Sequence, residues 1–147
     1  MKIVLGADEK THLTDVLASE LRARGHDVEV VGPPAGEDIG WVDVAEQVGR
    51  RVAAGEAAQG VVCCWTGTGV SMAANKVAGV RAALCWDAET ARGARRWNDA
   101  NVLCLSLRTT SETVAKEILD AWFEAQPDPS EAENIEKVRA LDQRRET

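Results

Sequence analysis

Residues 60–69 of this 147-residue chain read Gly-Val-Val-Cys-Cys-Trp-Thr-Gly-Thr-Gly. The nearly unbroken apolar run that ends at Cys64 is typical of a central parallel strand covered on both faces. The glycines and threonines that follow predict a tight turn into a helix, because glycine lets the backbone turn sharply and approach a ligand closely. The segment therefore predicts a strand, a turn and a helix in the middle of an α/β fold.

The rest of the chain alternates short β-branched runs with helical patterns, as in a parallel sheet with crossover helices. We expect a doubly wound α/β domain over residues 1–126, with a five-stranded parallel sheet and helices on both faces. The expected strands cover residues 2–6, 27–31, 60–64, 81–86 and 102–105. The expected helices cover about residues 11–24, 42–52, 70–76, 89–97 and 111–125.

After Pro127 and Pro129, a charged helical tail is expected over residues 130–144. Its apolar positions are too few to anchor a helix alone; they are Ile135, Val138 and Leu141. We therefore expect residues 127–147 to form a C-terminal helical tail that packs on a partner subunit or else frays.

The composition narrows the class of protein. An apolar content of 45% supports one core, and 24 acidic against 17 basic residues give a net charge of -7. Such a charge disfavours binding to nucleic acid or to anionic lipid. The sequence contains no apolar stretch long enough to cross a bilayer and no secretory leader pattern. We expect a cytoplasmic protein that binds a small molecule.

Four cysteines lie inside apolar runs, at positions 63, 64, 85 and 104. They show no paired Cys-x-x-Cys spacing, and the only histidines are His12 and His26, so we predict no metal site. Cys64 differs because it ends its strand beside a helix N-terminus, which favours the reactive thiolate, whereas Cys63 should face the other side of the sheet. Spacing alone leaves a buried structural role for Cys64 open.

Ligands of open parallel sheets bind at the carboxyl ends of the strands, where three segments carry candidate residues. Asp8 and Glu9 follow the first strand, although Asp8 could equally cap a helix. The turn at residues 66–71 could bind an anion or only connect a strand to a helix, and it lacks the glycine pattern and the lysine of nucleotide-binding loops. The third segment is Trp97-Asn98-Asp99, and the nearby Arg92, Arg95 and Arg96 read as a solvated helix face.

Residues 64–76, 79–85 and 98–105, with the Gly6-Ala7-Asp8 start, closely resemble the family of type B ribose-5-phosphate isomerases and galactose-6-phosphate isomerase subunits. The resemblance covers about residues 1–125. It implies a flavodoxin-like sandwich and a homodimer, or a dimer of dimers, whose active site takes residues from both subunits. It also implies aldose-ketose interconversion through a cis-enediolate, with neither a redox cofactor nor a metal.

The resemblance further implies a role for each matching residue. Cys64 corresponds to the base, Thr66 to a threonine that contacts the substrate, and Asp8 to the acid that holds sugar hydroxyls. The substrate-binding positions implied are the anion hole of Gly67, Thr68, Gly69 and Ser71, the cleft asparagine Asn98, and Arg108, which would contact the phosphate.

Departures from the family pattern fall on substrate-handling positions. Glu9 and Trp97 stand where the family commonly has histidines, the second of which usually opens the sugar ring. Trp65 stands where a glycine is usual, and Trp86 where a smaller or polar residue is common. An acidic segment replaces the basic phosphate-binding tail, although Arg139, Arg144 and Arg145 follow it.

We therefore expect an isomerase of pentose or hexose phosphates with altered specificity, in which Glu9, Trp65 and Trp97 contact the substrate. The alternative is a non-catalytic sugar or metabolite sensor on the same scaffold. A nucleotide-binding flavodoxin-like domain is a weaker third interpretation.

Overall fold

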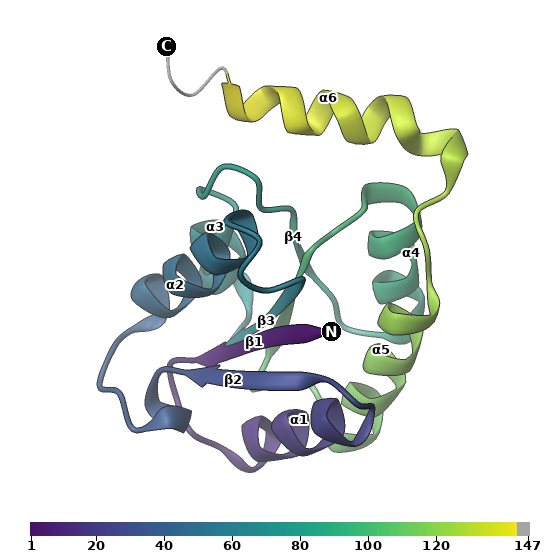
Figure 1. Cartoon of the computed structure of the whole chain (residues 1–147). Helices are drawn as coiled ribbons and strands as arrows, with labels where there is room; N and C mark the ends of the chain where they lie inside the picture. The colour runs from purple at the N-terminus through teal and green to yellow at the C-terminus, as the bar shows by residue number, and fades with distance from the viewer. Residues whose placement is uncertain (144–147) are drawn as a thin grey trace.

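The computed structural model describes residues 1–143 and contains one five-stranded parallel sheet (Figure 1). The strands are β1 (Lys2–Ala7), β2 (Asp27–Val31), β3 (Gln59–Cys64), β4 (Ala82–Leu84) and β5 (Val102–Ser106). Their order across the sheet is β2-β1-β3-β5-β4. The expected α/β class is confirmed, and relative to the 2-1-3-4-5 order of flavodoxin the last two strands are exchanged.

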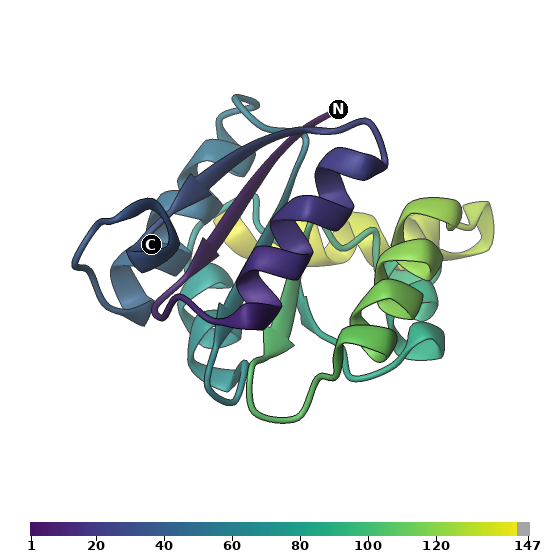
Figure 2. The ribbon, with the colours of Figure 1, turned by 90° about the horizontal axis from the view of Figure 1, so that it is seen from below.

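Helices cover both faces of the sheet, which confirms the three layers (Figures 1 and 2). One face packs against α1 (His12–Ala23), α4 (Ala88–Asn98) and α5 (Glu112–Glu124). The other packs against α2 (Trp41–Ala53) and α3 (Thr68–Ala74). No helix within residues 1–143 is both long and apolar enough to cross a membrane.

Strand β3 is buried along its whole length and serves both layers. Its side chains alternate between the faces of the sheet, as the period of two of a strand requires. Val61 and Cys63 join the core beneath α1, α4 and α5, whereas Val62 and Cys64 join the core beneath α2 and α3. The prediction that Cys63 and Cys64 point to opposite faces is therefore confirmed.

Several boundaries differ from the expected ones. Thr11 caps α1 in a capping box with Thr14, so Asp8 is not a helix cap. Helix α3 begins at Thr68, two residues earlier than expected, directly after the left-handed Gly67. Strand β4 has three residues instead of the expected six. Arg95, which the sequence places on a solvated helix face, is buried, with its guanidinium over the ring of Trp122.

The tail forms a short 3-10 helix, Pro129–Glu131, and then α6 (Ala132–Gln143), which lies beyond the edge strand β4 (Figure 1). Ile135 is its one buried residue among those described, whereas Val138 and Leu141 are about half exposed. Helix α6 therefore carries apolar side chains that are not covered by the rest of its own subunit. Arg144 and Arg145 lie outside the described residues.

Candidate active site

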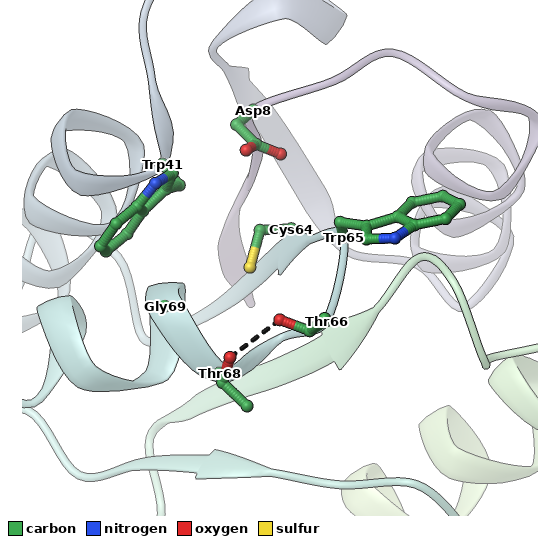
Figure 3. Close-up of a pocket in the computed structure, with 7 residues that line it drawn as sticks. All are labelled: Asp8, Trp41, Cys64, Trp65, Thr66, Thr68 and Gly69. Atoms are coloured by element: carbon green, nitrogen blue, oxygen red, sulfur yellow. Dashed lines mark hydrogen bonds between the residues drawn. The ribbon is translucent and has the colours of Figure 1, made fainter.

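A pocket of about 320 Å³ opens where β1 and β3 end (Figure 3). It is lined by Asp8, Trp41, Cys64, Trp65, Thr66, Thr68 and Gly69. Strands β1 and β3 are neighbours, but the chain leaves β1 toward β2 and leaves β3 toward the other side of the sheet. The pocket thus lies at the topological switch point, where open α/β sheets bind their ligands.

Cys64 is the last residue of β3, and its thiol points into this pocket (Figure 3). The other three cysteines are enclosed in the core, where burial raises the pKa of the Cys85 thiol to about 12 and also raises the pKa values of Cys63 and Cys104. Burial holds such thiols in their neutral, unreactive form. Among the four, Cys64 is the thiol that a ligand in the pocket would meet.

The turn after Cys64 supplies hydroxyl groups and glycines. The hydroxyls of Thr66 and Thr68 lie 2.8 Å apart and are hydrogen-bonded, below the thiol in Figure 3. Gly67 has φ of 78°, and a Cβ there would stand 2.5 Å from Leu84 Cδ1. Only glycine fits this position, and it lets the first turn of α3 start directly beside the pocket.

Asp8 directly follows β1, and its carboxyl group faces the pocket from the side opposite the threonines (Figure 3). Burial raises its pKa above the ordinary value; a backbone hydrogen bond opposes this effect, and the charge of Glu9 adds to it. Glu9 itself is exposed and does not line the pocket. A carboxyl group in this position can accept hydrogen bonds from ligand hydroxyls.

Trp65 and Trp41 flank the pocket on opposite sides of Cys64 (Figure 3). Trp65 was expected at the site, but Trp41, the first residue of α2, was not. Its ring lies on Gly69, where an added Cβ would stand 2.9 Å from Cε3 of the indole. The sequence shows only a tryptophan after Gly40, and no motif links it to the turn at residues 66–71.

Two other expected residues lie near the pocket without lining it. Arg108 follows β5, and its backbone N–H donates to the carbonyl oxygen of Trp65 at 2.9 Å, so its loop adjoins the turn. Its side chain is exposed. The backbone N–H of Ser71 donates to the carbonyl oxygen of Gly67 at 3.3 Å, so the N–H groups suited to bind an anion are those that precede Ser71 in the first turn of α3.

Trp97 and Asn98 are not part of this pocket, contrary to the expectation that they follow at the same edge. Helix α4 runs back across the sheet and ends beside Arg81, directly before β4, at the amino ends of the strands. Both residues line a separate groove of about 500 Å³ along α4, together with the exposed Trp86. Within one chain, Asn98 and Cys64 therefore lie at opposite edges of the sheet.

Two basic residues noted in the sequence, Arg139 and His12, contact acidic side chains. Arg139 on α6 donates to Asp99 at 3.0 Å and to Glu136 at 3.3 Å. His12 is exposed and contacts Glu112. Among residues 1–143, no group of three or more His, Cys, Asp or Glu side chains is arranged to hold a metal ion.

Comparison with known proteins places these features in a family. The sequence profile described as Ribose/Galactose Isomerase matches residues 3–141. The chain is 38% identical over 149 aligned positions to ribose-5-phosphate isomerase B of Escherichia coli, covering 98% of each sequence. It is 34% identical to D-erythrulose-4-phosphate isomerase of Pectobacterium atrosepticum, over 94% of this chain and 93% of that one.

A solved structure agrees with the sequence comparisons. Ribose-5-phosphate isomerase B of Mycoplasma genitalium, solved with bound ribulose 5-phosphate, superposes with a TM-score of 0.88 at 32% identity. The match covers 97% of this chain and 96% of that one. The resemblance seen in the motifs is thus confirmed over nearly the whole chain.

Proposed function

Because the chain belongs to the ribose/galactose isomerase family of sugar-phosphate isomerases, we propose that it interconverts the aldose and ketose forms of a short-chain sugar phosphate, with Cys64 as the base. One observation carries the proposal: the Cys64 thiol faces a pocket at the switch point, between a carboxyl group and a pair of hydroxyls. This constellation suits proton transfer on a polyhydroxy carbonyl compound.

The proposed reaction is redox-neutral overall. The Cys64 thiolate removes a proton from C2 of the open-chain aldose, the electron pair moves to the carbonyl oxygen, and a cis-enediolate forms. Transfer of a proton from O2 to O1 and return of the first proton to C1 give the ketose. The first N–H groups of a helix lack partners within the helix, so those at the start of α3 are suited to stabilise the enediolate oxygen. Asp8 holds the substrate hydroxyls, and Thr66 and Thr68 border the opposite side.

Phosphate binding is assigned to Arg108. Among the described residues that line the pocket none is a lysine or an arginine, and the loop that carries Arg108 is hydrogen-bonded to the pocket turn. An arginine there can bind phosphate bidentately. The relative solved with ribulose 5-phosphate supports a phosphorylated substrate. Since relatives that cover nearly the whole chain are named for a pentose phosphate and for a tetrulose phosphate, we leave the chain length of the sugar to experiment.

Trp97 and Asn98 are proposed to complete the pocket of a partner subunit in a homodimer. They lie at the edge of the sheet opposite Cys64, in a groove whose indoles are open to solvent. The exposed apolar side chains of α6 support the packing of the tail on the same partner. The four free, buried thiols suit a reducing compartment, and we propose the cytosol.

Solvent-deuterium incorporation, followed by NMR, tests the reaction. Tetrose, pentose and hexose phosphates and the corresponding free sugars are incubated with the enzyme in D₂O. Wild type should label the carbon next to the carbonyl of one phosphorylated sugar, and Cys64→Ala should lower the rate by about 10²–10⁴-fold. Cys63→Ala is the matched control, because this neighbouring thiol lies in the opposite core layer. Equal rates in wild type and Cys64→Ala contradict the assignment of the base.

A non-catalytic sugar or metabolite sensor is the second candidate, favoured by the indoles of Trp41 and Trp65 on either side of the pocket. Aromatic faces bind apolar faces of ligands without requiring chemistry. A sensor would show quenched indole fluorescence with a sugar phosphate and no deuterium exchange. Exchange that depends on Cys64 excludes this function.

A further inference from the structure

Asp99 lies at the centre of three guanidinium groups that come from three different segments. Its carboxylate is 3.4 Å from Arg81 Nη2, 3.3 Å from Arg95 Nη1 and 3.0 Å from Arg139 Nη2. Arg81 directly precedes β4, Arg95 is on α4, and Arg139 is on α6. One carboxylate therefore joins the edge strand, the end of α4 and the tail helix.

The backbone of Asp99 is held as tightly as its side chain. It caps α4 in the left-handed conformation, with φ of 47° and ψ of 45°, and its N–H donates to Ala94. Its carbonyl oxygen accepts from Arg81 Nε at 2.8 Å. Trp97 and Asn98 are the last two residues of α4, and the ring of Trp97 lies on Gly93 of the same helix. Asp99 therefore fixes the point at which the helix ends, directly after these two residues.

Conformation alone does not explain an aspartate at this position. The left-handed conformation is strained for a non-glycine residue, and glycine would adopt it without that strain. The carboxylate, however, offsets the mutual repulsion of the largely buried Arg81 and Arg95 and of the exposed Arg139. Burial lowers the pKa of Arg81, and the charge of Asp99 opposes that effect.

Helix α6 has few other attachments to the domain. Ile135 is its buried side chain within residues 132–143, and Asp142 accepts a hydrogen bond of 2.8 Å from the backbone of Gly79. The ion pair between Arg139 and Asp99 therefore ties the position of the tail to the end of α4.

We propose that Asp99 is a positioning residue: it does not touch the substrate, but its carboxylate orients Trp97 and Asn98 for the partner's pocket and couples them to α6. This inference rests on the proposed function, in which Trp97 and Asn98 complete that pocket. In this proposal, substrate affinity depends on the ion pairs of Asp99 with three arginines, which lie at the amino ends of the strands, opposite Cys64.

Two variants separate the carboxylate from the backbone conformation. Asp99→Gly keeps the left-handed conformation and removes the side chain, whereas Asp99→Asn keeps an acceptor oxygen without the charge. Asp120→Asn is the control, because Asp120 also accepts from an arginine, Arg24 at 2.6 Å, but lies on α5 away from the groove.

The first readout is the ¹⁵N–¹H signal of the Trp97 indole, assigned by its loss in Trp97→Phe. Asp99→Gly should shift or broaden this signal and leave that of Trp41, at the other edge, in place. Asp99→Asn should show a smaller change, and Asp120→Asn none. An unchanged Trp97 signal in Asp99→Gly overturns the proposal.

The second readout is kinetic. Asp99→Gly should raise KM about tenfold, which corresponds to about 1.4 kcal/mol of binding free energy, and leave kcat within about twofold. An unchanged KM, or an equal rise in Asp120→Asn, overturns the proposal. If wild type exchanges no sugar, the proposed function fails, and the Trp97 signal alone decides the role of Asp99.

The coupling to α6 is tested with Arg139→Met. Alone it should shift the Trp97 signal less than Asp99→Gly does, and in the double variant it should add nothing, because both changes break the same ion pair. Additive effects in the double variant would overturn the coupling.

Discussion

Polar side chains have opposite environments at the two ends of the parallel strands, which we call the carboxyl edge and the amino edge of the sheet. At the carboxyl edge, Asp8, Cys64 and the hydroxyls of Thr66 and Thr68 face a pocket between two indoles. At the amino edge, the carboxylate of Asp99 is surrounded by three arginines. The first edge leaves polar groups for a ligand, whereas the second pairs them within the protein. In the proposed function, the residues that carry out the chemistry and the residue that positions its partners therefore lie at opposite edges of the sheet.

This separation has a physical reason. A buried carboxyl group without a cationic partner is costly to ionise, and burial accordingly raises the pKa of Asp8. A carboxylate among arginines is stabilised and can hold several elements together. Substitutions of Asp8 or Cys64 should therefore lower the exchange rate, while substitutions of Asp99 should change substrate affinity and the placement of the tail.

The largest effect in this comparison is expected from Gly67→Ala. Left-handed strain and the collision of the new Cβ with Leu84 and the backbone of Leu105 should together lower the free energy of unfolding by about 2–4 kcal/mol. Gly25→Ala is the control: its φ is 88°, but no atom lies within 4 Å of the added Cβ, so we expect a loss of about 1 kcal/mol. Urea unfolding measures both, and equal losses would refute the tight turn.

Asp8→Asn should lower the exchange rate by about 10–100-fold, because an amide cannot provide the charge-assisted hydrogen bonds of a carboxylate. At neutral pH, however, the variant should be at least as stable as wild type, since it removes an ionised group that burial disfavours. Exchange kinetics and melting curves measure the two effects. Lower stability at neutral pH together with full activity would show that Asp8 is structural.

The pH dependence of stability checks the same residue. The pKa of Asp8 is raised in the folded protein, so its protonated form contributes stability in acid, below the ordinary value of 3.8. That contribution is lost as the pH rises through the folded pKa. The difference in melting temperature between Asp8→Asn and wild type should therefore grow in favour of the variant between acid and neutral pH. A difference that shrinks contradicts the direction of the shift.

The smallest expected effect is that of Trp41→Ala. Loss of the indole that lies on Gly69 removes one wall of the pocket, and KM should rise about fivefold to tenfold with little change in kcat. Val42→Ala is the control, since Val42 is similarly exposed on the same helix but does not line the pocket. Steady-state kinetics that show no difference between the two variants would remove Trp41 from the site.

Features that depend on residues close together in the chain could be predicted from the sequence. Strand periodicity placed Cys63 and Cys64 on opposite faces, and the glycine-rich turn after Cys64 lies at the predicted edge of the sheet. These features depend on residues that are neighbours in the chain. The alternation of strands and helices likewise gave the α/β class, with boundaries mostly shifted by one or two residues.

Features that depend on contacts distant in the sequence were missed. Trp41 reaches the pocket only because α2 packs beside α3. No local sequence pattern indicates that β3 and β5 are neighbours in the sheet. The segment Trp97-Asn98-Asp99 was expected at the carboxyl edge, although the predicted alternation already requires the helix between β4 and β5 to run back and to end at the amino edge. Arg95 was read as solvated, although its charge is buried against Trp122 and Asp99.

Subunit complementation tests most directly whether the two edges act together in one site. Cys64→Ala and Asn98→Ala chains, each expected to have low activity alone, are unfolded, mixed in equal amounts and refolded. If the site combines the carboxyl edge of one subunit with the amino edge of its partner, random pairing in a two-fold dimer leaves one intact site in each mixed dimer and restores roughly a quarter of wild-type exchange activity. Activity no higher than the mean of the two separate variants would contradict a shared site.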